Sequence, residues 1–369
     1  MKFQTTKTSL LNIILLASRA INPKTTSFIL NGIMLETGRD LTVYSTDLET
    51  SIKCVKPVKV IEKGKAVVPS RVLVNILKSL KESKLEVELD DSKNQVKIKC
   101  ENAFFTLNIL PVAEYPEFPR IKKEKSLKIS LDKFKNLVTS AQKAASIDES
   151  RAILTGVFME IKEGVLSMVA TDSYRLSLIK EKIDKSSSSV GVVVPAKVLD
   201  SIAKSDYRGK DIEINIEENQ ISFYLEGSDG EKDIIVSRLL SGKFPEYSQL
   251  IPKKMKHNIL IDKDKLLEVV KRISSISQDN IPVRIIIDKG KIEVSMSVKE
   301  VGSSSEGFEI SYGEEKMEIA FNPEFLIDGI GIMEGKNVIL SINDPLRPIL
   351  IKPEKGEKIV YLLMPIRVS

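Results

Sequence analysis

The chain contains three copies of one short sequence pattern, and this repeat constrains its fold more than any other feature. The pattern Val-Val-Pro-Ser-Arg-Val-Leu at 67–73 returns as Val-Val-Pro-Ala-Lys-Val-Leu at 193–199. A more divergent copy, Ala-Phe-Asn-Pro-Glu-Phe-Leu, lies at 320–326. The copies are roughly 125 residues apart, which is the length of a whole domain and far exceeds a solenoid repeat. The sequence therefore predicts three similar domains in a row.

Other segments repeat with the same period. Leu-Thr-Val-Tyr-Ser-Thr-Asp at 41–47 resembles Leu-Ser-Met-Val-Ala-Thr-Asp at 166–172, whereas the third copy keeps the strand at 292–297 and lacks the Thr-Asp pair. An apolar stretch near the start of each copy predicts a first helix at 10–20, 134–145 and 266–276. We place the domains at residues 1–124, 125–252 and 253–369.

Each copy is predicted to be an α+β domain, with two helices packed on antiparallel sheets. The expected N-caps of the first helices are Thr8, Asp132 and Asp262. The second helices are expected to begin at Pro69, Pro195 and Pro323, because proline suits the first helical position. Alternating segments such as 85–89 and 212–216 predict strands, and the serine run at 186–189 predicts a loop.

Composition limits the compartment and the possible chemistry. The 369 residues are 42% hydrophobic, and the only cysteines are Cys54 and Cys100, with His257 as the single histidine. These numbers favour free structural thiols in a reducing compartment over disulfides or a zinc site. No segment reaches the ~18 apolar residues of a membrane span, and the apolar N-terminal stretch recurs within the chain, unlike an export signal. We therefore predict a cytoplasmic protein without membrane segment, metal or cofactor.

Basic residues recur on one face of the second helix. In the first copy, Val72, Leu73, Ile76, Leu77 and Leu80 form an apolar stripe, and Arg71, Asn75 and Lys78 share another face. In the second copy, that other face carries Lys197, Ser201 and Lys204. Two interpretations remain open: a solvated surface, or a surface that faces a phosphate backbone without reading sequence. The third copy has Phe325 and Ile332 at the basic positions, so its second helix is expected to serve another purpose.

The residues predict no catalytic centre. The chain has a single histidine and lacks a phosphate-binding loop, a dinucleotide fingerprint and a nucleophile elbow. Asp47 and Asp172 each follow a threonine at the end of a strand, and we interpret them as turn residues. An enzyme with an inter-domain cleft built around Asp172 and Arg175 remains an alternative, as does a monomeric scaffold that binds peptides.

Several motifs resemble one known family. Ala-Thr-Asp-Ser-Tyr-Arg-Leu at 170–176 resembles the Ala-Thr-Asp-Gly-His-Arg-Leu motif of the bacterial DNA polymerase III beta subunit, the beta sliding clamp. The C-terminal Tyr-Leu-Leu-Met-Pro-Ile-Arg at 361–367 is similar to that family's Tyr-Val-Val-Met-Pro-Met-Arg. The resemblance implies a head-to-tail homodimer that closes a ring of six similar domains around duplex DNA, with helices lining the hole. It also implies a non-catalytic role, tethering the replicative polymerase.

The resemblance assigns roles to particular residues. Lys24, Arg71, Lys78, Lys197 and Lys204 are implied to face DNA, and Phe105, Leu107 and Ile276 to form the dimer interface. A partner-binding groove between the second and third domains is implied to consist of Leu154, Thr171, Ser173, Tyr174, Arg175, Leu176, Pro245, Leu250, Asn322, Phe325, Leu362, Leu363, Met364, Pro365, Ile366 and Arg367. Such a groove suits a short segment with a polar leading residue and aliphatic and aromatic anchors.

The implied partners are duplex DNA, a second copy of the chain, the replicative polymerase, the clamp loader, and other polymerases and repair proteins that carry short motifs. The chain departs from the family pattern at Ser173 and Tyr174, which stand in place of Gly-His. Gln249 stands where some members have a pocket arginine, and Ser275 stands where the dimer interface calls for an apolar residue.

Overall fold

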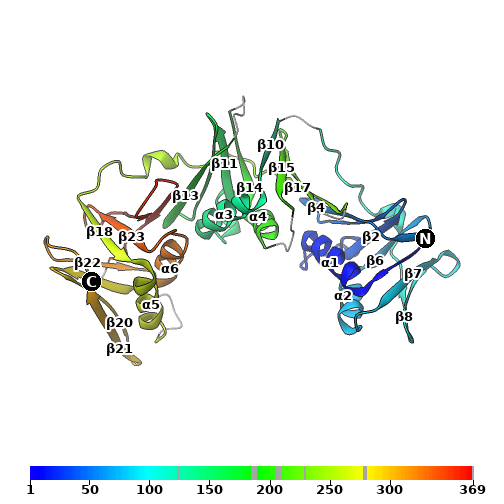
Figure 1. Ribbon diagram of the computed structural model, residues 1–369, viewed down its shortest axis with the longest axis horizontal. Helices are drawn as coiled ribbons and strands as arrows, with labels where there is room; N and C mark the ends of the chain where they lie inside the picture. Colours follow the sequence, from blue (N-terminus) through cyan, green and yellow to red (C-terminus); the bar gives the residue numbers. More distant parts are fainter. Residues whose placement is uncertain (123–124, 184–188, 205–208, 228–229, 277–280, 368–369) are drawn as a thin grey trace. The chain divides into compact units, whose positions relative to one another are not determined.

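The structure is a computed structural model that describes residues 1–122, 125–183, 189–204, 209–227, 230–276 and 281–367. Its contacts divide the chain into two compact units (Figure 1). The first unit comprises Met1–Lys135 and Ser201–Leu239, and the second comprises Asn136–Asp200 and Leu240–Ser369. Residues 186–188 of the predicted serine loop lie outside the described residues.

The first unit contains two antiparallel sheets. The five-stranded sheet has the order β5 (Lys59–Glu62), β1 (Lys2–Thr6), β7 (Lys84–Asp90), β8 (Gln95–Cys100) and β9 (Ala103–Asn108). The eight-stranded sheet has the order β10 (Lys125–Ser130), β15 (Asp211–Ile216), β16 (Gln220–Glu226), β17 (Lys232–Arg238), β4 (Thr50–Lys56), β3 (Leu41–Thr46), β2 (Gly32–Thr37) and β6 (Gly64–Pro69). The pairing of β17 with β4 joins the second sequence copy to the first.

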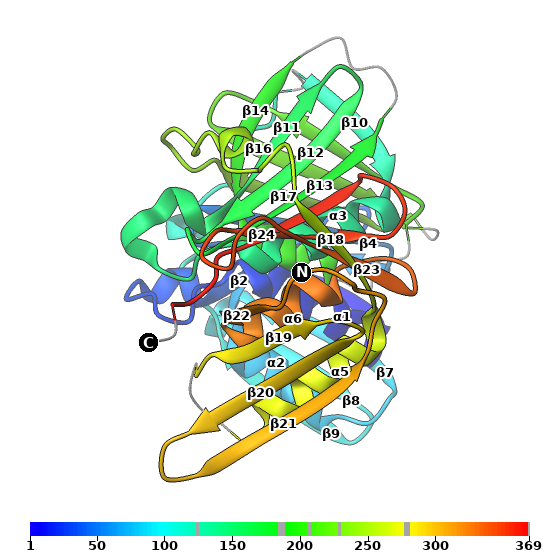
Figure 2. The same ribbon diagram turned by 90° about the vertical axis from the view of Figure 1, so that its left-hand side faces the viewer.

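The second unit repeats this plan. Its eight-stranded sheet has the order β14 (Val190–Pro195), β11 (Gly156–Lys162), β12 (Val165–Thr171), β13 (Arg175–Lys182), β25 (Ile359–Leu363), β24 (Ile349–Pro353), β23 (Asn337–Ile342) and β18 (His257–Asp262). Its four-stranded sheet has the order β21 (Gly302–Glu309), β20 (Lys291–Val298), β19 (Val283–Asp288) and β22 (Met317–Phe321). In Figure 2 the red strands β24 and β25 continue the green strands of the same sheet.

Two helices belong to each sequence copy, as predicted. They are α1 (Lys7–Ala17) and α2 (Ser70–Ser79), α3 (Leu131–Ala141) and α4 (Ala196–Ala203), and α5 (Lys263–Ser274) and α6 (Pro323–Gly331). Helix α1 packs on β3 and β4. Helix α5 packs on β19, β20 and β21 (Figure 2). The buried residues of α1 are Leu10, Ile13, Ile14 and Ala17, and those of α5 follow the same spacing. This spacing places them on one side of the helix, toward the sheet.

The predicted helix starts need correction at four places. Helix α1 is capped by Thr6, which accepts a hydrogen bond from the Ser9 N–H, and Thr8 lies inside the helix. Helix α3 begins at Leu131, so Asp132 lies in its first turn and is not the cap. Pro69 and Pro195 are the last residues of edge strands β6 and β14, where a missing N–H costs no ladder hydrogen bond. Asp262 caps α5 and Pro323 is the first residue of α6, as predicted, and Asn322 caps α6.

The apolar stripe of α2 is narrower than predicted. Leu73 and Leu77 are buried, whereas Val72 is 44% exposed, because it points about a quarter turn away from them. Both cysteine thiols are free and buried, as expected. Among the described residues, no helix is long and apolar enough to span a membrane, and no group of three or more potential ligands is placed to hold a metal ion.

Candidate functional site

Five predicted groove residues lie in or next to the turn between β12 and β13. They are Thr171, Ser173, Tyr174, Arg175 and Leu176, and Asp172 lies among them. Asp172 Oδ1 accepts hydrogen bonds from the backbone N–H groups of Tyr174 (2.9 Å) and Arg175 (3.0 Å). Thr171 Oγ1 donates to the Arg175 carbonyl (2.7 Å). Ser173 adopts φ 80°, a left-handed conformation that glycine adopts at lower cost. The interpretation of Asp172 as a turn residue is therefore confirmed.

The first sequence copy forms the same turn. Asp47 Oδ1 accepts from the backbone N–H groups of Glu49 (3.1 Å) and Thr50 (2.7 Å), and Leu48 adopts φ 74°. The repeat therefore preserves the turn geometry, and any difference in function comes from the side chains that surround it.

Arg151 fixes the Ser173 turn from outside, and the sequence analysis missed it. Arg151 belongs to the short 3-10 segment Glu149–Thr155. Its Nη1 donates to Ser173 Oγ (2.8 Å), and its Nη2 donates to the Asp172 carbonyl (3.3 Å). These bonds tie the turn to the 3-10 segment. Sequence spacing gives no signal for them.

Arg175 lies at the centre of a charged cluster. Its Nε contacts Asp172 Oδ2 at 3.0 Å, and its Nη1 contacts Asp328 Oδ2 at 2.7 Å and the Tyr361 hydroxyl at 3.4 Å. The guanidinium lies 4.0 Å from the centroid of the Phe325 ring, which permits a cation–π interaction. Burial alone lowers the pKa of Arg175, but its polar partners more than offset this and raise the pKa above its ordinary value. The guanidinium is thus a charged group that is held through Nε and Nη1.

Tyr361 and α6 pack closely around this cluster. Burial raises the pKa of the Tyr361 phenol, and its hydroxyl donates to the Phe325 carbonyl at 2.9 Å. A Cβ on Gly329 would lie 2.5 Å from the Tyr361 ring, so only glycine permits this approach of α6. The position of Phe325 explains why the third copy departs from the basic pattern: its ring supports Arg175.

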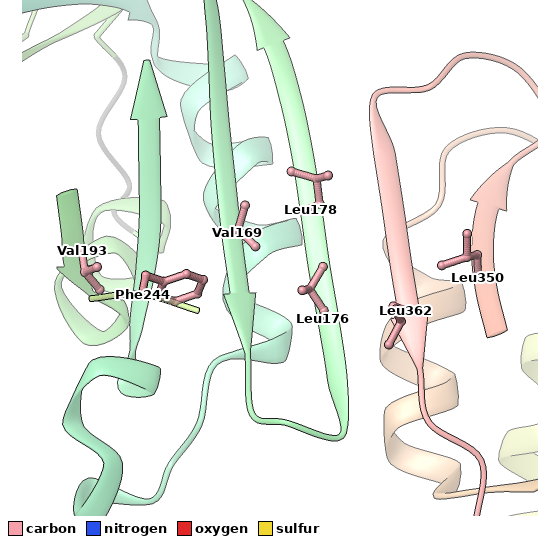
Figure 3. Close-up of a cluster of buried hydrophobic side chains, with 7 residues drawn as sticks. All are labelled: Val169, Leu176, Leu178, Val193, Phe244, Leu350 and Leu362. Atoms are coloured by element: carbon pink, nitrogen blue, oxygen red, sulfur yellow. The ribbon is translucent and has the colours of Figure 1, made fainter. Parts of the chain in front are cut away.

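An apolar band crosses the large sheet of the second unit next to this turn. The band consists of buried Val169, Leu176, Leu178, Val193, Phe244, Leu350 and Leu362 (Figure 3). Leu176 pairs with Leu362, and Leu362 pairs with Leu350, so leucines occupy three successive strands at one level. The Phe244 ring stacks on Phe158 with centroids 5.2 Å apart. Tyr247, Ile251 and Met255 pack against the band from the connecting segment.

The C-terminal segment runs along the edge of the turn. The Met364 N–H donates to the Tyr174 carbonyl (2.9 Å), and the Ile366 N–H donates to the Ala320 carbonyl (2.8 Å). Tyr174 is 63% exposed, Met364 38% and Ile366 37%. These two anchors hold apolar side chains at the surface, beside the buried band.

The other predicted groove residues differ in burial and in role. Leu154 and Leu363 are buried in the core, and Leu363 faces the opposite side of β25 from Leu362. The Asn322 side chain is used to cap α6, accepting from the N–H groups of Glu324 and Phe325. Pro245, Leu250 and Arg367 are exposed, and Pro365 is half-buried.

The apolar band of the second unit extends over more strands than its counterpart in the first. In the first unit, the described cluster of Met34, Val67, Leu110 and Tyr115 occupies the corresponding end of the sheet. By strand register, the three leucine positions of the second unit correspond to Ser51, Val236 and Ser222. Lys53 lies on the same sheet, with its Nζ 4.1 Å from the centroid of the Phe118 ring. The difference lies in the side chains, because the strand pairing is the same in both units. A comparison of the copies at these strand positions offers a sequence signal for the band.

All five residues implied to face DNA are exposed. Arg71 and Lys78 lie on α2, Lys197 lies on α4, and Lys24 and Lys204 lie in connecting segments. Within the first unit, Arg19 donates to the carbonyl groups of Ser201 and Lys204, which ties the end of α1 to the end of α4.

The residues implied in dimerisation lie at or near sheet edges. Phe105 is half-buried and Leu107 is 7% exposed on β9, an edge strand of the five-stranded sheet. Phe104, on the other face of β9, is 70% exposed. Ile276 is half-buried and follows α5, the helix that packs on edge strand β21.

Three family models match consecutive segments of the chain. They describe the N-terminal, central and C-terminal domains of the DNA polymerase III beta subunit, and they match residues 1–119, 128–246 and 248–367. The beta sliding clamp of Bacillus subtilis is 30% identical, with all of both chains covered, and that of Rickettsia felis is 30% identical over 89% of each. The crystal structure of the Bacillus subtilis DNA polymerase sliding clamp superposes with a TM-score of 0.92 over all of both chains.

The fold is therefore that of a three-domain DNA clamp. The chain belongs to the DNA polymerase III beta subunit family. Its role is that of a processivity factor, a non-catalytic subunit of the polymerase. Membership overturns the alternative of an enzyme built around Asp172 and Arg175, whose side chains instead hold a turn in place.

Proposed function

We propose that two copies of this chain close head to tail around duplex DNA and bind replication partners through a groove in the second unit of each copy. One observation carries the groove assignment: exposed Tyr174 and Met364 are joined by a backbone hydrogen bond and lie beside the buried apolar band. Exposed apolar side chains grouped in this way are typical of binding surfaces. We keep the domain boundaries at 1–124, 125–252 and 253–369, and we place the protein in the cytoplasm.

The groove is expected to take a short peptide in extended form. Tyr174, Met364 and Leu250 offer apolar surface for the aliphatic and aromatic anchors of a short segment with a polar leading residue. This chemistry fits short motifs of the replicative polymerase, the clamp loader and repair proteins. Arg175 supports the turn that carries Tyr174, since its Nε and Nη1 contact Asp172, Asp328 and Tyr361.

DNA contact is assigned to exposed lysine and arginine residues on the helices and on the segments that connect them. Lys24, Arg71, Lys78, Lys197 and Lys204 would make water-rich contacts to phosphates, which suits a protein that must slide. Such contacts are few and independent of sequence, so topological closure retains the DNA.

The dimer is assigned to two unpaired sheet edges. Strand β9 is the edge of a sheet in the first unit, and β21 is the edge of a sheet in the second. Pairing of β9 in one copy with β21 in another would satisfy both edges and bring Phe105 and Leu107 toward Ile276. Because the two edges differ, the contact is head to tail, and two such contacts close a ring.

The test is retention on DNA of different topology. The protein is loaded with a bacterial clamp loader onto a nicked circular plasmid and separated by gel filtration, before and after one restriction enzyme linearises the plasmid. A clamp stays on the circle and leaves the linear form. Equal retention on both forms, or a monomeric mass in light scattering, would refute the ring and favour a monomeric peptide-binding scaffold.

A further inference from the structure

Asp328 joins two parts of the second unit that the sequence separates widely. Its Oδ2 contacts Arg175 Nη1 at 2.7 Å, and its Oδ1 contacts Lys143 Nζ at 3.0 Å. Arg175 begins β13, Lys143 lies just after α3, and Asp328 lies on α6. One carboxylate therefore holds a helix of the third sequence copy against two elements of the second.

The two contacts differ in exposure. The side chains of Arg175 and Asp328 are 12% and 24% exposed, whereas that of Lys143 is 43% exposed. Lys143 and Asp328 also line an open cavity of about 400 Å³ between α3, α5 and α6. Salt screens the exposed contact strongly and the enclosed contact weakly.

We propose that Asp328 is a positioning residue for partner binding, acting through Arg175; this inference rests on the groove proposed above. Asp328 holds the guanidinium on the Phe325 ring while Asp172 holds its Nε. The same Asp172 carboxylate accepts from the Tyr174 N–H, and the Tyr174 carbonyl accepts from Met364. An unbroken chain of polar contacts thus runs from α6 to the exposed apolar pair at the groove.

The consequence is a preorganised groove. Without Asp328, Arg175 keeps only one carboxylate and is free to leave Phe325, so the turn samples other arrangements. Measured affinity falls by the fraction of molecules that remain competent. If the turn adopts the arrangement that binds the partner about a tenth of the time, the affinity would be about tenfold weaker.

The experiment measures binding of a fluorescein-labelled peptide with a leading glutamine, two leucines and a terminal phenylalanine. Fluorescence polarisation compares the full-length wild type with Asp328→Asn and with the control Asp264→Asn, which makes the same change on α5, where Asp264 contacts Lys263. We expect about tenfold weaker binding for Asp328→Asn at both 50 and 500 mM NaCl, and an unchanged affinity for the control. Lys143→Met should change affinity less than threefold. Equal binding by the wild type and Asp328→Asn would overturn the proposal.

A double-mutant cycle separates positioning from general destabilisation. If Asp328 acts through Arg175, the double variant Arg175→Met/Asp328→Asn binds no more weakly than Arg175→Met alone. Additive losses would overturn the inference. Should Asp328→Asn fail to fold, Arg175→Lys supplies the second test, because lysine cannot engage both carboxylates in the planar geometry of arginine. It should also bind about tenfold more weakly, and unchanged binding would contradict us. Failure of the wild type to bind the peptide would instead count against the proposed groove.

Discussion

Removal of the C-terminal segment from Met364 to Ser369 should abolish most partner binding while the dimer persists. The described part of this segment is held by two backbone hydrogen bonds, from Met364 to Tyr174 and from Ile366 to Ala320. These bonds order the segment, and its exposed Met364 and Ile366 side chains would each contribute about 1–1.5 kcal/mol to partner binding. The expected loss is about 2–3 kcal/mol, which corresponds to a dissociation constant roughly 30–150-fold higher.

The assay combines peptide binding with solution mass. Fluorescence polarisation with the labelled glutamine–leucine–phenylalanine peptide reports the affinity, and light scattering reports the mass. The proposed dimer edges, β9 and β21, lie outside this segment, so the deletion variant should still have the mass of a dimer. Ile366→Pro is the narrower variant, because it removes the N–H that donates to Ala320 together with one apolar side chain, and it should weaken peptide binding by about 1 kcal/mol. Binding within threefold of wild type after the deletion, or dissociation of the dimer, would refute this reasoning.

Further predictions concern stability, the dimer and DNA. Ser222 Oγ is buried without a hydrogen-bond partner among the described residues, so Ser222→Ala should raise the free energy of unfolding by about 1 kcal/mol in urea titrations; a loss of that size would contradict us. Burial raises the pKa of Asp233 to about 6, from 3.8. The folded state therefore binds this proton more tightly than the unfolded state does. As pH rises from about 4 to about 6, the contribution of Asp233 should lower the free energy of unfolding by up to about 3 kcal/mol. Asp233→Asn should therefore raise the free energy of unfolding at pH 7 and hardly change it at pH 4. A rise that is the same at both pH values would disprove the raised pKa of Asp233. Phe105→Ala should raise the dimer dissociation constant at least tenfold in analytical ultracentrifugation, whereas Phe104→Ala should change it little. Replacing both Arg71 and Lys197 by glutamine should remove about two phosphate contacts. The slope of log binding constant against log salt concentration should then become less negative by about 1.8. An unchanged slope would show that these residues do not contact DNA.

The sequence analysis succeeded where the signal was local or repeated. Helix faces, strands and the turn roles of Asp47 and Asp172 follow from periodicity and from side chains that bond to backbone groups two or three residues away. Helix starts were less reliable: Pro69 and Pro195 end strands, because proline suits both the last position of an edge strand and the first turn of a helix. Local sequence does not separate these two uses.

The charged cluster around Arg175 could not be predicted from the sequence. Its partners Asp328 and Tyr361 lie 153 and 186 residues away, and nothing in their local pattern marks them as neighbours. The resemblance implied that Arg175 belongs to the groove, and the structure adds that its Nε and Nη1 contact Asp172, Asp328 and Tyr361. Leu363 was assigned to the groove beside Leu362, but successive strand residues face opposite sides of a sheet.

The threefold repeat, the α+β class and the apolar and basic helix faces can be recognised in the amino-acid sequence, because each rests on short local patterns. How far the apolar band extends across each of the two equivalent sheets required the folded structure. That extent depends on cross-strand neighbours: leucines meet across β13, β25 and β24 in the second unit, and Ser51, Val236 and Ser222 meet across the corresponding strands in the first. Strand register brings together residues that are far apart in sequence, and register is set by the folded sheet as a whole.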